Sequence, residues 1–215
     1  NHGHAINTSA SSQPKFLTNK YGSSSSGYHV IDFNDESGYL DLNLQSHNSK
    51  QATLFFVYDR QSVNTWDTTM HVIGSSSSDH VFWFMDNHNA SNTNSSYYSS
   101  GGSWEQVNVG RSGQLNLCVV RSDISNGSIY SNGELELENS NSVDLNIYNG
   151  YTFNNAYSSR LGAKAGSKIE HNTDAHLAEV IIINKKLTDA ELIQIQYKLS
   201  QKWGMTTDVD SDDDL

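Results

Sequence analysis

The chain has 215 residues, of which 35% are hydrophobic, 10% aromatic and only 17% charged, and its formal net charge at pH 7 is −11. This acidic balance argues against nucleic-acid binding, which needs a basic surface to release phosphate counterions. No apolar run is long enough to suggest membrane insertion. The apolar and aromatic content can supply a core, and all-β sandwiches of this length commonly form one domain.

Short apolar or alternating runs separated by turn residues predict a chain of many strands. In chain order we expect strands near 28–33, 39–44, 52–58, 70–73, 79–85, 106–109, 114–121, 128–131, 134–138, 143–148, 159–163 and 176–183. Leu54–Val57 and Val180–Ile183 are continuously apolar, which predicts central strands buried on both faces. Asn132-Gly133 predicts a type I′ hairpin turn, because both residues tolerate positive φ. Serine runs at 23–26, 75–78 and 95–100 predict surface loops.

One helix is predicted near residues 188–203. Thr188 and Glu191 have the spacing of a capping box, in which each side chain bonds the other residue's backbone amide. Apolar residues follow at helical spacing, and Gly204 is suited to end the helix. The apolar stripe consists of Leu192, Ile195, Leu199 and Trp203. The helix should therefore pack against the sandwich after the last strand.

The residues of the C-terminal third resemble a known family. Leu177–Asn184 (LAEVIIIN), Leu187–Glu191 (LTDAE) and Lys202-Trp203-Gly204 resemble the C-terminal signature of bacterial concanavalin A-like lectin/glucanase (LamG-like) domains. Tyr130–Gly133 and Arg160–Ala163 resemble earlier strands of that family. The resemblance implies an all-β fold: an antiparallel jelly-roll sandwich over residues 1–205 with one C-terminal helix. The family's opening Trp-containing motif is missing, so we expect a piece of a larger multidomain protein.

The segment 206–215 (TTDVDSDDDL) is expected to be an acidic linker, and it resembles the start of a thrombospondin type-3-like calcium repeat. Its alternating carboxylates are suited to ligate a hard cation such as calcium. The candidate metal ligands are Asp208, Asp210, Asp212 and Asp214. The pattern departs from the repeat because no glycine follows. Loop acids beside strand ends are weaker candidates for calcium, namely Asp35, Glu36, Asp86, Asp123 and Asp174.

Concanavalin A-like folds include both enzymes and binding modules, so the fold does not decide the function. Glu134, Glu136 and Glu138 are the nearest match to the paired carboxylates of glucanases, and strict alternation would place them on one strand face. No Asp lies between them, so we interpret this face as solvated. The single cysteine, Cys118, lies in an apolar run and is expected to be a buried hydrophobe. No Gly-x-Ser-x-Gly motif is present. The sequence therefore predicts no catalytic residues.

Aromatic residues within polar segments are candidates for ligand binding, because such rings stack on sugars or anchor a partner. They are Trp66, Tyr97, Tyr98 and Trp104. The first hypothesis is a non-catalytic extracellular or cell-surface adhesion module that binds a glycan or another surface ligand with calcium as a cofactor. The second is a structural or interaction domain of a surface filament or array. The third, a glycoside hydrolase, is disfavoured by the missing carboxylate motif.

Overall fold

The computed structural model describes residues 5–6, 13–21, 27–34, 38–42, 51–61, 68–73, 80–85, 95–99, 104–107, 113–123, 127–139, 159–163 and 173–205. These residues form two seven-stranded sheets, and every strand pairing is antiparallel. One helix, α1 (Asp189–Trp203), follows the last strand. The predicted all-β sandwich with a C-terminal helix is confirmed. Within the described ranges, no helix combines the length and apolar character that crossing a membrane requires.

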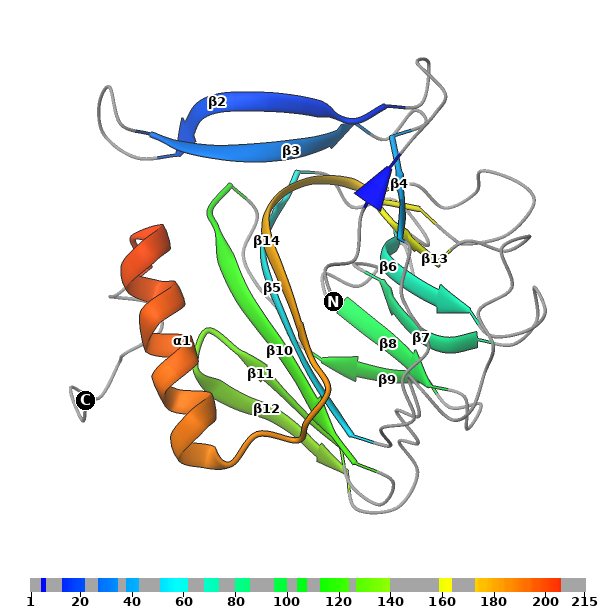
Figure 1. The fold of residues 1–215 in the computed structure, drawn as a ribbon, viewed down its shortest axis with the longest axis vertical. Helices are drawn as coiled ribbons and strands as arrows, with labels where there is room; N and C mark the ends of the chain where they lie inside the picture. Colours follow the sequence, from blue (N-terminus) through cyan, green and yellow to red (C-terminus); the bar gives the residue numbers. More distant parts are fainter. Residues whose placement is uncertain are drawn as a thin grey trace.

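We name the two sheets A and B (Figure 1). Sheet A has the order β1 (Ala5–Ile6), β4 (Leu40–Leu42), β13 (Ser159–Leu161), β6 (Thr68–Ile73), β7 (His80–Met85), β8 (Ser95–Ser99) and β9 (Trp104–Val107). Sheet B has the order β12 (Glu134–Asn139), β11 (Gly127–Ser131), β10 (Asn116–Ser122), β5 (Ala52–Arg60), β14 (Asp174–Ile183), β3 (Tyr28–Asn34) and β2 (Lys15–Tyr21).

The serine run 95–100 was expected to be a loop, but Ser95–Ser99 forms β8 between two other strands. That prediction is wrong because Tyr97 and Tyr98 favour a strand, and neighbouring strands supply the backbone hydrogen bonds. The predicted strand at 143–148 and the serine runs at 23–26 and 75–78 lie outside the described residues.

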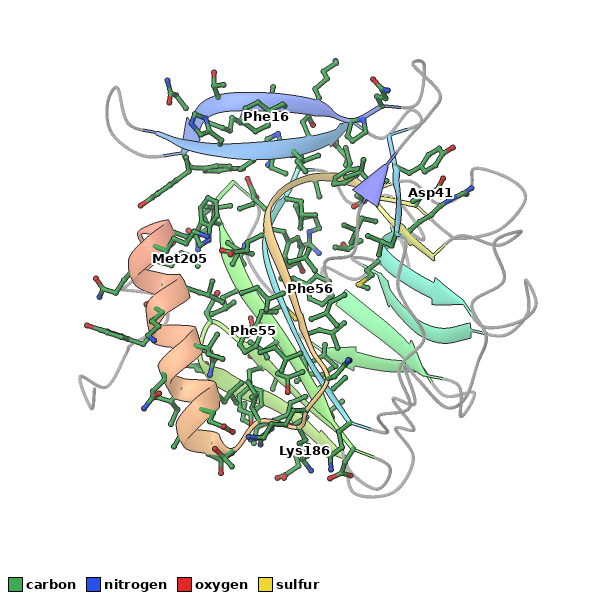
Figure 2. All side chains as sticks on the ribbon, in the orientation of Figure 1. Phe16, Asp41, Phe55, Phe56, Lys186 and Met205 are labelled. Atoms are coloured by element: carbon green, nitrogen blue, oxygen red, sulfur yellow. The ribbon has the colours of Figure 1, made fainter. Side chains whose placement is uncertain are left out.

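Sheet B has an apolar cluster on each of its faces. β5 is buried along its whole length, as its apolar run predicts. Its successive side chains point to opposite faces of the sheet, so alternate residues pack into each cluster. Phe56 packs with Met70 and Leu161 of sheet A, in the core between the sheets. Phe55 packs on the other face of β5, in the cluster that contains Leu192 of α1. Figure 2 shows Phe55 on the α1 side of β5 and Phe56 on the opposite side. The molecule is therefore layered as sheet A, sheet B and helix.

β14 is central, but Val180–Ile183 is only partly buried. The sequence predicted that this segment would be buried on both faces, and the pairing register explains why it is not. β3 pairs with β14 over Asp174–Leu177 alone, whereas β5 pairs with β14 as far as Ile183. In the described part of the chain, Val180–Ile183 therefore has a strand partner on one side only, with α1 packed over one of its faces.

Both local motifs of the sequence form as predicted. Thr188 Oγ1 accepts from the Glu191 amide at 3.3 Å, and the Glu191 carboxylate accepts from the Thr188 amide at 2.9 Å. Gly204 ends the helix with φ of 68°. The bond from Lys185, followed by the Thr188 bonds, lowers the pKa of Glu191 to about 2. Asn132 and Gly133 have φ of 50° and 91° and join β11 to β12, as a type I′ turn requires.

Candidate functional site

A continuous line of paired residues crosses six of the seven strands of sheet A, from β4 to β9. Asp41 on β4 is opposite Arg160 on β13, which is opposite His71 on β6. The line continues through Trp83 on β7, Tyr98 on β8 and Trp104 on β9. We call these six positions the outer row. With strands about 4.8 Å apart, its five steps span about 24 Å.

The outer row belongs to the face of sheet A turned away from sheet B. Residues directly opposite each other in an antiparallel pair share a face, and successive residues of a strand alternate. Leu40 and Leu42 pack against the core between the sheets, and Leu161 and Met70 are buried in it. The positions between or beside them, Asp41, Arg160 and His71, therefore fall on the other face. β6 keeps regular pairing from Met70 to Val72, so the row is unbroken there.

The polar end of the outer row is a charge pair stacked on an aromatic ring. Arg160 Nε donates to Asp41 Oδ1 at 3.0 Å. The guanidinium carbon of Arg160 lies 4.4 Å from the centre of the Tyr39 ring, within cation–π range. The two side chains differ in exposure, at 10% for Arg160 and 30% for Asp41. Figure 2 shows Asp41 on the β4 side of the molecule, remote from α1. The carboxylate is thus the more accessible partner.

A second line of positions runs beside the outer row on the same face. Thr68 is opposite Met85, which is opposite Ser96, which is opposite Gln106. On β7, β8 and β9 these positions lie two residues from those of the outer row, so both lines share one face. The face therefore combines aromatic positions with hydroxyl and amide residues, which can donate and accept hydrogen bonds.

The candidate ligand-binding residues predicted from the sequence do not all lie together in the structure. Tyr98 and Trp104 are opposite each other in the outer row. Tyr97 lies in the neighbouring line with Phe84 and Met70, and Met70 is a core residue. Trp66 lies outside the described residues, as do Asp208, Asp210, Asp212 and Asp214 of the acidic tail. The binding roles of all these residues stay predictions.

The three glutamates that resembled a glucanase motif do not share a strand face. Glu134 is opposite Ser131 and Glu138 is opposite Ser128, but a bulge lies between them. The bulge inserts Glu136 between the pairs made by Leu135 and Leu137, so alternation reverses along β12. Glu134 and Glu138 consequently fall on opposite faces, contrary to the expectation from strict alternation. All three side chains are exposed, as expected for a solvated strand.

A buried polar network lies on the helix side of sheet B. Asp59 is 1% exposed and accepts from the Gly113 amide at 2.8 Å, from the Tyr21 hydroxyl and from Gln61 Nε2. The Tyr21 oxygen lies 2.6 Å from His176 Nδ1. Burial, with the Asp59 carboxylate next in size, raises the pKa of Tyr21, so the phenol stays protonated. Both oxygens of Asp59 accept hydrogen bonds, and the network ties β2 to β5 and β14 rather than presenting a reactive group.

His176 is the titratable centre of that network. It is 4% exposed, directly opposite Asp59 on β5 and Asp32 on β3. Burial lowers its pKa, while Asp32 opposes that shift. Because the Tyr21 hydroxyl donates its hydrogen bond to Asp59, His176 Nδ1 must be the donor to the Tyr21 oxygen. His176 Nε2, at 3.7 Å from Asp32 Oδ1, gains a donor only on protonation.

Some of the candidate calcium ligands, and Cys118, lie within the described residues. No group of three or more His, Cys, Asp and Glu side chains with metal-binding geometry occurs among the described residues. Of the loop acids, Asp123 pairs with Lys186 at 2.8 Å, and Asp174 begins β14. Asp35, Glu36 and Asp86 lie outside the described part of the chain. Cys118 is buried in the core between the sheets, as predicted.

Sequence reasoning missed Asp41, Arg160 and Trp83 as members of one row. Their strands are far apart in the chain, and only the strand order brings them side by side. A local signal existed for two of them, since Asp41 lies between two leucines and Trp83 between two phenylalanines.

Comparison with known proteins supports the architecture. The family model described as the concanavalin A-like lectin/glucanases superfamily matches residues 34–193. The chain belongs to this superfamily. The match includes the outer-row strands β4, β13, β6, β7, β8 and β9. No curated protein matches the chain in sequence.

Among solved structures, the chain is similar to domain 4 of AbnA, a GH43 extracellular arabinanase from Geobacillus stearothermophilus solved with arabinotriose. The two are 17% identical with a TM-score of 0.59, over 90% of this chain and 87% of that domain. The CBM40 of Ruminococcus gnavus IT-sialidase, bound to α2,3-sialyllactose, is 13% identical with a TM-score of 0.53, over 69% of this chain and 83% of the other.

A sialidase from Trypanosoma rangeli is 12% identical with a TM-score of 0.59, and the match covers 80% of this chain. The chain spans only 28% of the length of that sialidase. At identities this low, these three likenesses concern the fold alone.

Proposed function

We propose that this chain is a non-catalytic glycan-binding module and that the outer row of sheet A is its binding surface. The observation that carries the proposal is the row itself, in which Trp83, Tyr98 and Trp104 continue in register from the Asp41–Arg160 pair. Aromatic faces pack on the apolar faces of sugar rings, and carboxylate, hydroxyl and amide groups bond sugar hydroxyls. The similar structures include two modules solved with oligosaccharides, which supports the same reading.

The absence of catalysis is part of this proposal. A retaining glycosidase needs two carboxyl groups about 5–5.5 Å apart across the scissile bond. Glu134 and Glu138 fall on opposite faces of the edge strand β12. Asp41 is the only carboxylate among the six positions of the outer row. Hydrolysis of a β-glucan that is lost on changing Glu134 or Glu138 would instead support a glycoside hydrolase.

The setting we propose is an extracellular or cell-surface adhesion protein of which this module is one part. Calcium assistance is proposed for the acidic tail, where Asp208, Asp210, Asp212 and Asp214 alternate. A glycan array read with and without EDTA tests both ideas. Retention of a glycan supports binding, and its loss with EDTA supports calcium dependence. Concentration-dependent assembly in sedimentation, with no glycan retained, would favour a structural domain of a filament or array.

Tyr98→Ala is the direct test of the surface. Truncating an aromatic anchor at the centre of an interface typically costs about 2 kcal/mol, or roughly 30-fold in Kd. Tyr197→Ala is the matched control, because Tyr197 is an exposed tyrosine on α1, on the far side of sheet B. We expect Tyr98→Ala to weaken retention of a bound glycan and Tyr197→Ala to leave it unchanged. Equal effects from both variants would remove sheet A as the binding surface.

A further inference from the structure

We propose that the outer row selects neutral sugars and discriminates against sugars that carry a carboxylate. The inference rests on the proposed function, since it names the ligand class of the same surface. Its basis is the Asp41–Arg160 pair, where the cation that an acidic sugar would need already has a carboxylate partner at 3.0 Å.

The exposures of the two side chains decide which charge a ligand meets. Arg160 is 10% exposed and stacks on Tyr39, whereas Asp41 is 30% exposed. An arriving carboxylate therefore approaches the more accessible Asp41 oxygen and is repelled, since like charges at contact distance disfavour each other. A sugar hydroxyl meets the same oxygen as a hydrogen-bond acceptor and can donate to it. The same pair thus favours a hydroxyl and opposes an anion.

The rest of the face supplies no fixed positive charge among its described positions. The outer row continues through His71, Trp83, Tyr98 and Trp104, and the second line contains Thr68, Met85, Ser96 and Gln106. Apart from the charge pair, His71 is the one position in the two lines that can become cationic near neutral pH. The net charge of −11 adds a long-range repulsion for anions at low salt. Binding should therefore be measured at pH 8, well above the ordinary pKa of a histidine side chain.

The test compares sugars that differ only in an acidic unit, such as lactose with sialyllactose, and xylo-oligosaccharides with and without a glucuronate branch. For the wild-type protein at pH 8, calorimetry should give at least about tenfold tighter binding to the neutral member of whichever pair binds. Tighter binding to the acidic member overturns the inference and leaves the proposed function standing. Failure to bind any sugar on a broad array overturns the proposed function and this inference with it.

Asp41→Asn tests the mechanism. Removing the carboxylate charge removes the repulsion that an anionic ligand meets at this pair, so the affinity ratio should shift toward the acidic sugar by about tenfold or more. Asp123→Asn is the matched control, because it removes the same charge from a carboxylate paired with Lys186. An unchanged ratio for Asp41→Asn, or equal shifts in both variants, overturns the proposed role of the pair. The wild-type comparison stands even if Asp41→Asn fails to fold.

Discussion

Replacing Asp59 with alanine should cause a large loss of stability. The Asp59 carboxylate is 1% exposed and accepts hydrogen bonds from Gly113, Tyr21 and Gln61. Alanine would leave these donors without an acceptor in a site nearly closed to water. Deleting one partner of a buried charged network costs about 3–5 kcal/mol. For a chain of this length that corresponds to a fall in Tm of roughly 6–20 °C.

The asparagine variant separates hydrogen bonding from charge. Asp59→Asn keeps the shape and one oxygen for the Gly113 amide, so the expected loss is smaller, about 1–2 kcal/mol. Urea unfolding followed by tryptophan fluorescence at pH 7.5 gives the free energy of unfolding for each variant. Asp123→Ala serves as a control, because its pair with Lys186 is partly exposed and should contribute less than about 1 kcal/mol. An alanine variant within 1 kcal/mol of wild type, or no worse than asparagine, would refute the reasoning.

Three further outcomes follow from the same structure. Because burial lowers the pKa of His176 below its unfolded value, the unfolded state binds more protons in acid. The stability from neutral His176 should be present above pH 6.5, the ordinary value, and be lost as the pH falls below it. Unfolding free energies of His176→Gln should therefore depend less on pH between 7.5 and 5 than those of wild type, and equal slopes would contradict this. Gly162→Ala should lose about 2–4 kcal/mol, since φ is +82° and the new Cβ would lie 2.2 Å from Phe33. Gly113→Ala, with φ of +87° and nothing within 4 Å of the new Cβ, should lose only about 1–2 kcal/mol; equal losses would show that the clash contributes nothing. We also expect the acidic tail to bind calcium with a Kd of about 10⁻⁴–10⁻³ M, and identical calorimetric heats with and without residues 206–215 would rule this out.

Features that depend on neighbouring residues were predictable from the sequence. The Thr188–Glu191 capping box and the Asn132-Gly133 turn are specified by side chains within a few positions, and both form as expected. The continuous burial of β5 follows from its unbroken apolar run. The fold class itself followed from the resemblance of the C-terminal block, which the family model confirms.

Features that depend on strand pairing were not predictable in this way. Ser95–Ser99 reads as a loop by composition, and it becomes a strand because β7 and β9 pair with its two edges. The bulge at Glu136 reverses alternation, which no period-two pattern reveals. The outer row can be recognised only when the order of six strands is known. The pairing of Asp41 with Arg160, 119 residues apart in the chain, could therefore not be predicted from the sequence. Non-local register, rather than residue type, limits what a single sequence tells about this surface.

The position of α1 makes the two ends of the layered stack chemically distinct. The helix covers sheet B (Figure 1). Its Lys198 is exposed, while the single cysteine of the chain is buried between the sheets. Lys198→Cys would therefore introduce one accessible thiol on the helix side. Coupling through that thiol would attach every molecule to a sensor surface in one orientation, with the outer face of sheet A directed into solution.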